Sequence, residues 1–166
     1  MEQLYAEAGC KPKKNGKDYL IQIGMIAGVI VCVGLFLFSG SILLGLLGTA
    51  GIVAVVLLYP KLNYEYEYVF CDGQIDFDKI QGGNRRKTVL KVDMDDMELC
   101  GPVKASELAS YKNLKVKDFS SRKEDAATYA AIVSIKGENV RILFDPTQKM
   151  LEAMRMKSPR KVLKNW

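Results

Sequence analysis

The stretch YLIQIGMIAGVIVCVGLFLFSGSILLGLLGTAGIVAVVLLY, residues 19–59, decides the fold because it contains no Asp, Glu, Lys or Arg. A bilayer's hydrocarbon core is about 30 Å thick and is crossed by about 20 helical residues. The run is about twice that long and is interrupted by Ser39-Gly40-Ser41. It therefore predicts two transmembrane helices, 19–38 and 42–59, joined by a tight turn, with the second helix ended by Pro60.

Outside this run the composition is that of a slightly basic soluble domain. The 166 residues carry 24 Lys and Arg against 19 Asp and Glu, a net charge of +5, and no His. Without His there is no Ser-His-Asp or Cys-His catalysis, and the four cysteines form no CxxC metal or redox motif. The sequence thus predicts no enzyme activity, no cofactor and no metal.

The placement of lysines predicts how the helices are oriented. Lys11, Lys13, Lys14 and Lys17 precede the first helix, and the turn carries no charge. Since cytoplasmic flanks are rich in Lys and Arg, both termini are expected in the cytoplasm, on a cell-membrane protein with two spans. A cleaved signal peptide is the alternative, but the run is far longer than a 7–15-residue signal core. Because no charged residue interrupts the spans, we expect an anchor without an ion pathway.

Small residues indicate how the two helices pack. Gly24 and Gly28 form a GxxxG pair, and in an antiparallel hairpin they lie at the depth of Gly51. Gly34 similarly lies near Gly45. These five glycines are therefore predicted to pack the hairpin, and a dimerisation face is the alternative.

Residues 60–157 predict a β domain that ends in a helix. Aromatics alternate with Glu in Tyr64–Phe70, and Asp72-Gly73 is a two-residue hairpin signal. A second strand, Gln74–Ile80, is expected after this turn. In total, about seven antiparallel strands are expected before the helix. Asp145 is the expected N-cap of a helix at about 146–157. Residues 1–18 and 158–166 are taken as a cytoplasmic segment and a basic tail.

This order resembles the pleckstrin-homology-like superfold, a bent antiparallel barrel or sandwich capped by one helix. Three segments are also similar to a family of small uncharacterised bacterial membrane proteins of unknown function; they are Asn63–Tyr68, Asp72–Ile80 with Arg85-Arg86-Lys87, and Phe144-Asp145-Pro146 with Met150-Leu151 and Pro159. The resemblance covers nearly the whole chain and supplies no catalytic residue. Pleckstrin domains that bind phosphoinositides resemble one another in a basic loop between the first two strands. Here that position is taken to be the acidic turn Asp72-Gly73, which argues against recognition of inositol-lipid headgroups.

Two basic groups are the candidate sites for anionic lipid. They are the strand start Arg85, Arg86 and Lys87, and the tail residues Arg160, Lys161 and Lys164. The alternatives are a solvated strand that pairs with Asp76 or Asp78, and a frayed terminus.

The sequence therefore predicts an α+β membrane protein that acts as an interaction or scaffold module at the inner leaflet. Its expected partners are the lipid bilayer, anionic headgroups and another membrane protein, and no nucleic acid. An anionic-lipid sensor is the alternative function. An accessory subunit of a membrane enzyme or transporter is a weaker one.

Overall fold

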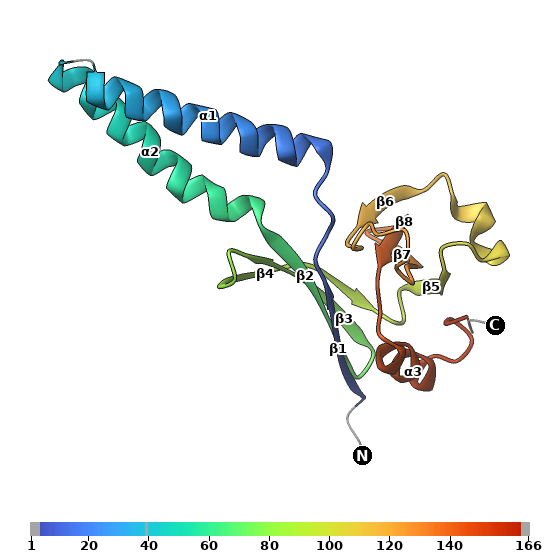
Figure 1. Ribbon diagram of the computed structural model, residues 1–166. Coiled ribbons are helices and arrows are strands. Elements are labelled where there is room, and N and C mark those ends of the chain that lie inside the picture. The colour runs from blue at the N-terminus through green and yellow to red at the C-terminus, as the bar shows by residue number, and fades with distance from the viewer. Residues whose placement is uncertain (1–3, 39, 164–166) are drawn as a thin grey trace. The chain divides into compact units, whose positions relative to one another are not determined.

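The computed structural model describes residues 4–38 and 40–163, which form a helical hairpin and a β domain (Figure 1). The hairpin consists of α1 (Gly16–Phe38) and α2 (Ile42–Leu62). The β domain comprises the strands β1 (Tyr5–Cys10), β2 (Tyr64–Cys71), β3 (Gln74–Gln81), β4 (Arg85–Asp93), β5 (Met97–Pro102), β6 (Lys115–Asp118), β7 (Tyr129–Ile135) and β8 (Glu138–Phe144), with the 3-10 helix η1 (Ser106–Tyr111) and the helix α3 (Gln148–Lys157).

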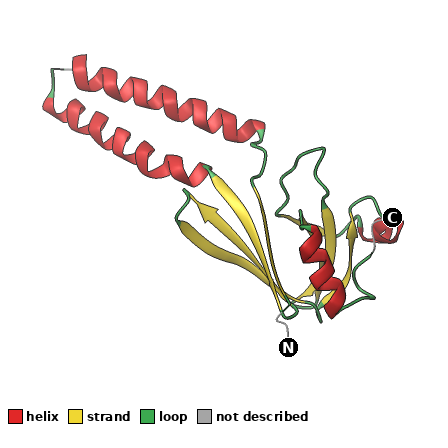
Figure 2. Ribbon diagram, turned by 60° about the horizontal axis from the view of Figure 1, so that its bottom comes forward, coloured by secondary structure: helices red, strands yellow, loops and turns green. Residues whose placement is uncertain are grey.

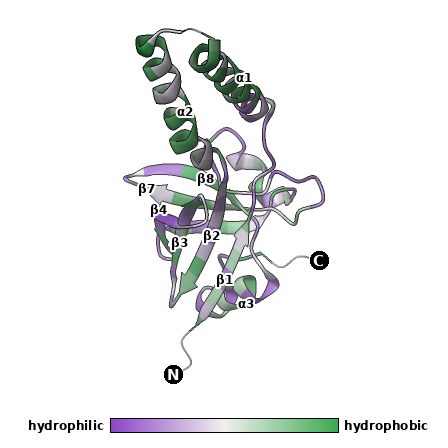
Figure 3. Cartoon of the chain, turned by 60° about the vertical axis from the view of Figure 1, so that its left-hand side comes forward, coloured by the Kyte–Doolittle hydropathy of each residue, from purple (hydrophilic) through white to green (hydrophobic). Residues whose placement is uncertain are grey.

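The two hairpin helices run antiparallel and are mostly green, which marks hydrophobic residues, in Figure 3. Many of their large apolar side chains are exposed. Both are long and apolar enough to cross a bilayer. The expected end of the second helix at Pro60 is wrong, since α2 continues to Leu62. A proline loses one backbone hydrogen bond and crowds the carbonyl four residues earlier. Pro60 lies in the last turn of α2, and the helix ends two residues after it.

Close packing of the hairpin is concentrated on one side of α2. A Cβ on Gly48 would lie 2.7 Å from Cys32 O, and a Cβ on Gly51 would lie 2.5 Å from Cys32 Sγ. Gly45 faces Phe36. The remaining predicted glycines do not pack against α2, because a Cβ at Gly24, Gly28 or Gly34 would meet nothing within 4 Å. The error came from matching residues by depth alone, which ignores the face of the helix on which each one lies.

Gly48→Val should therefore weaken the hairpin, because the added side chain collides with the α1 backbone. We expect a loss of about 1–3 kcal/mol of helix packing, measured as a lower melting temperature of the full chain in detergent. Gly28→Val carries the same change in helix propensity into open space and is the matched control. Equal melting of the two variants would contradict this packing.

The β domain contains two four-stranded sheets, drawn in yellow in Figure 2. The first has the strand order β1-β2-β3-β4, and the second has the order β5-β7-β8-β6. The expected all-antiparallel arrangement is wrong at one place, because β6 pairs with β8 in parallel. A long connection containing η1 separates β5 from β6, so the chain can cross over before β6 forms.

Strand β1 was not expected from the sequence; it lies before the hairpin in the chain and pairs with β2, which follows the hairpin. The antiparallel register runs from Tyr5 opposite Cys71 to Cys10 opposite Tyr66. Ala6 and Ala8 point into the core, whereas Tyr5 and Glu7 are exposed. Residues 4–10 therefore belong to the β domain, and the hairpin is the connection between its first two strands.

This strand also corrects the position of the acidic turn. Asp72 and Gly73 have φ values of +48° and +109°, which suit the tight hairpin that the sequence predicted. However, they join the second and third strands. The objection to recognition of inositol-lipid headgroups, which rested on this turn, is therefore removed.

Aromatic side chains from both sheets form the centre of the core. The ring of Phe77 lies 5.0 Å from Phe119 and 5.7 Å from Phe144 between centroids, and Tyr68 lies 5.5 Å from Phe77. Met150, Leu151 and Met154 of α3 pack against this cluster and are fully or nearly fully buried. The helix thus closes the core that the two sheets share.

The start of α3 differs from the expectation. Thr147 is the N-cap, and its side chain accepts a hydrogen bond from Met150 N–H at 3.3 Å. Asp145 instead accepts hydrogen bonds from Ser121 N–H and Thr128 Oγ1, both at 2.7 Å. Both residues suit an N-cap by type, and the two donors that face Asp145 account for its different role.

Because β1 and β2 are neighbours, a short turn should replace the whole hairpin. Substituting Asn-Gly for residues 11–65 joins Cys10 to Tyr66 through a two-residue turn, and these two residues already lie opposite each other in the ladder. We expect a soluble chain that melts cooperatively. In the same chain, Ala6→Asp should abolish that transition, because it buries a carboxylate at a site that is 1% exposed. The placement of β1 would be contradicted if the chain with the Asn-Gly turn is unfolded, or if that chain still melts cooperatively with Ala6→Asp.

Candidate functional site

The basic cluster at the start of β4 divides into one paired residue and two exposed ones. Arg86 forms an ion pair with Glu67, and its Nε lies 3.8 Å from Asp78 Oδ2. Asp78 is buried, so Arg86 serves as its counter-ion. Arg85 and Lys87 are exposed, and no described residue pairs with them. Any external anion would therefore meet Arg85 and Lys87 first.

Pairing of the cluster within the sheet was the alternative that the sequence left open, and the structure favours it for Arg86. Asp76, the other acid considered there, pairs instead with Lys91 at 3.0 Å. The Arg86–Asp78 and Lys91–Asp76 pairs join the neighbouring strands β4 and β3, where opposite charges are mildly stabilising. The Arg86–Glu67 pair instead reaches across β3 to β2. Their arrangement is that of a solvated sheet face.

The described part of the tail, residues 158–163, lies on β5. Lys161 Nζ donates hydrogen bonds to Met94 O at 2.8 Å and to Asp95 O at 3.0 Å. Arg160 is exposed, and Lys164 lies outside the described residues. Within the tail, Arg160 is therefore the predicted lipid contact that remains exposed and unbonded in the described part of the chain.

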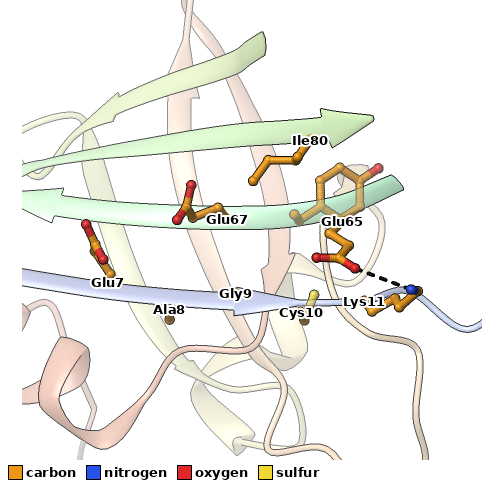
Figure 4. Close-up of a pocket in the computed structure, with 9 residues that line it drawn as sticks. Glu7, Ala8, Gly9, Cys10, Lys11, Glu65, Glu67 and Ile80 are labelled. Carbon is orange, nitrogen blue, oxygen red and sulfur yellow. Dashed lines mark ion pairs between the residues drawn. The ribbon is translucent and has the colours of Figure 1, made fainter. Parts of the chain in front are cut away.

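A pocket of about 420 Å³ lies along the β1–β2 ladder (Figure 4). Its acidic lining residues are Glu7, Glu65 and Glu67. Each carboxylate already has a partner, since Glu65 pairs with Lys11 at 3.3 Å, Glu67 with Arg86, and Glu7 accepts from the Tyr5 hydroxyl. Among residues 4–38 and 40–163, no group of three or more His, Cys, Asp or Glu side chains could hold a metal ion. The pocket is therefore a charged surface groove.

A cysteine and a tyrosine tie β1 to the core beside this groove. Cys10 Sγ lies 2.8 Å from the Tyr68 hydroxyl, and that hydroxyl donates to Phe119 O. Burial raises the pKa of the Cys10 thiol to about 11 and also raises the pKa of Tyr68. Burial likewise raises the pKa of Cys100 to about 12. Both thiols stay protonated at neutral pH, so neither is an activated nucleophile.

Polar side chains order the loop that follows β6. Asp118 accepts hydrogen bonds from the backbone N–H and hydroxyl of Ser120 and from Arg122 Nε. Burial opposes ionisation of Asp118, but these hydrogen bonds outweigh it and lower the pKa. The same loop accepts a bond from Lys13 N–H at Ser121 O, so the network positions a turn and contains no activated base.

The sheet order, the closing helix and the position of the apolar hairpin can be compared with known families. Residues 2–164 match the family described as Bacterial PH-like domain (DUF6106). The chain belongs to this family. No curated protein and no solved structure matches it.

Membership of the bacterial PH-like family confirms the resemblance that the sequence suggested, and the family is one of unknown function. Sequence reasoning missed two parts of the surface, namely β1 and the docked tail. The alternation of buried Ala6 and Ala8 with exposed Tyr5 and Glu7 was the available signal for β1. For the tail, the signal was the aliphatic pair Val162-Leu163 after Pro159.

Proposed function

We propose that this PH-like protein is a membrane-anchored, non-enzymatic interaction module, held at the inner leaflet by its two-helix hairpin. The observation that carries the proposal is the β1–β2 ladder, which joins strands from the two ends of the hairpin. The hairpin exposes apolar side chains that water solvates poorly. A bilayer would cover them.

The ladder restricts the topology of the chain. Cys10 pairs with Tyr66, so both ends of the hairpin must lie on one side of the membrane. Two antiparallel spans satisfy this condition. The four lysines between Lys11 and Lys17 favour the cytoplasmic side, and the described tip, Gly40-Ser41, is uncharged.

An interaction role fits the surface better than catalysis does. In the described part of the chain, Lys11 and Arg86 form ion pairs with Glu65 and Glu67 of the β1–β2 groove, and Glu7 accepts a hydrogen bond from Tyr5. The thiols of Cys10 and Cys100 are protonated. A site that performs acid–base or nucleophilic chemistry needs such groups free and activated. What the domain offers instead is exposed strand edges and charged side chains.

Fusions with two reporters test the anchoring. Green fluorescent protein at either terminus should fluoresce, because both termini are expected in the cytoplasm. Alkaline phosphatase should be active only when it is inserted at Gly40. If one terminus reports as cytoplasmic and the other as external, the hairpin is refuted. If alkaline phosphatase is active at both termini, the position at the inner leaflet is refuted.

An anionic-lipid sensor is the second candidate function, and the exposure of Arg85 and Lys87 supports it. The first inter-strand connection, which is basic in phosphoinositide-binding pleckstrin domains, is here the hairpin itself with four lysines at its start. Anionic lipid attracts a basic side chain near its surface by about 1 kcal/mol. Arg85 and Lys87 are the residues of the cluster that are available for this contact.

Hydrogen exchange in nanodiscs tests the lipid contact. With anionic lipid, amides 85–87 of the full chain should exchange more slowly than with neutral lipid, and added salt should remove the difference. Arg85→Ala with Lys87→Ala should also remove it. The double variant Lys112→Ala with Lys115→Ala changes two exposed lysines of another segment and should keep it. Equal exchange in both lipids would exclude the contact.

A further inference from the structure

The free edge of β5 is occupied by the tail of the same chain. Cys100 N–H donates to Lys161 O, and Cys100 O accepts from Leu163 N–H, both at 2.7 Å. The two bonds form a parallel bridge between Cys100 and Val162. Because β5 is the edge strand of its sheet, the tail adds one short segment of strand beside it.

Side chains give this edge a defined shape. Val162 is 3% exposed and belongs to the main core cluster. The Leu163 side chain lies over Gly101, where a Cβ would come within 2.6 Å of Leu163 Cδ1. Arg155 Nη2 of α3 donates to Leu163 O at 2.6 Å. The tail therefore lies in a groove between β5 and α3 that is open because residue 101 has no side chain.

A third subsite selects a cation. The ammonium of Lys161 lies on the carbonyl oxygens of Met94 and Asp95, in the turn before β5. Three successive positions are thus recognised in different ways. The first takes an ammonium on carbonyl oxygens, the second takes a branched aliphatic side chain in the core, and the third takes a leucine over a glycine.

The bound tail is suited to exchange. It is joined to the domain by the short turn after α3. It is attached by one bridge with two backbone hydrogen bonds to β5, by the hydrogen bonds of Lys161 and Arg155, and by the buried side chain of Val162. Added strands of this kind obtain affinity from the backbone and specificity from alternate side chains. A competing segment can reproduce every one of these contacts.

We propose that the groove between β5 and α3 is a docking site for an extended segment of a partner protein with the pattern Lys-Val-Leu, and that the tail occupies the site until such a segment displaces it. This inference rests on the proposed role as an interaction module and names the surface used. It does not depend on which side of the membrane the domain lies, so the reporter fusions and the test below can fail separately.

Binding of a labelled peptide of residues 158–166 to the full chain in detergent micelles tests the proposal. Val162→Asp should release the tail, because it places a carboxylate in a buried aliphatic site. This variant should bind the peptide about tenfold or more tightly than the wild-type chain does, since the wild-type groove is already filled. The same peptide with Asp in place of the valine should not bind. Equal binding to both chains, or no binding to the variant, would overturn the proposal.

Two further variants keep the test decisive. Lys161→Ala removes the ammonium from its carbonyl oxygens without touching the core. It should weaken the attachment of the tail and raise peptide binding above that of the wild-type chain, also if Val162→Asp does not melt cooperatively. Gly101→Val fills the space of Leu163 and should prevent peptide binding in either background. Peptide binding that survives Gly101→Val would show that the groove is not the site. A wild-type chain that forms dimers by exchanging tails would overturn the assignment to a different partner.

Discussion

The six-residue ladder between β1 and β2 joins two strands that lie on opposite sides of the apolar hairpin in the sequence. An antiparallel pair normally needs only a two-residue turn, but here the connection contains two helices of 23 and 21 residues. The pairing is possible only if those helices return the chain to where it started. This requirement fixes the hairpin as an antiparallel pair and makes its two ends one attachment point for the β domain.

The same ladder determines how the core is completed. Ala6 and Ala8 contribute little volume themselves, but β1 covers one edge of β2, on which Tyr68 and Phe70 are fully buried. The Cys10–Tyr68–Phe119 contacts then connect the first sheet to the loop after β6. Strand β1 precedes the hairpin in the chain, and its partner β2 follows the hairpin. Because the paired residues are far apart in sequence, we expect this pairing to form late in folding. The apolar hairpin and the β domain are therefore coupled through chain connectivity.

The sequence predicted the features that depend on local pattern. The charge-free run indicated the two helices, the alternation in Tyr64–Phe70 indicated a strand, and Asp72-Gly73 indicated its turn. What it missed depends on distant partners. Small alanines gave β1 a weak signal, and its partner strand lies beyond the hairpin. Asp145 looked like a helix cap until Ser121 and Thr128 were seen to face it. Arg86 and Lys161 were candidate lipid contacts. For Arg86 the sequence offered pairing with Asp76 or Asp78 as the alternative, but only the fold supplies Glu67, and only the fold supplies the carbonyl oxygens that bind Lys161.

A disulfide between the two paired strands measures the central claim most directly. Tyr5 lies opposite the exposed, free Cys71. The adjacent Asp72 N–H donates to Leu4 O, so the Tyr5–Cys71 pair is of the non-hydrogen-bonded type, with Cα atoms about 4.5 Å apart. Disulfides form at this separation.

Mild oxidation of native membranes that contain Tyr5→Cys should link residues 5 and 71. After trypsin cleaves the lysines before α1, the N-terminal peptide should remain attached to the β domain until a reductant is added. Glu7→Cys is the control, since its diagonal distance to Cys71 is about 7–8 Å and too long for a disulfide. A Tyr5→Cys chain that releases the peptide without a reductant, or that behaves like Glu7→Cys, would contradict the pairing of β1 with β2.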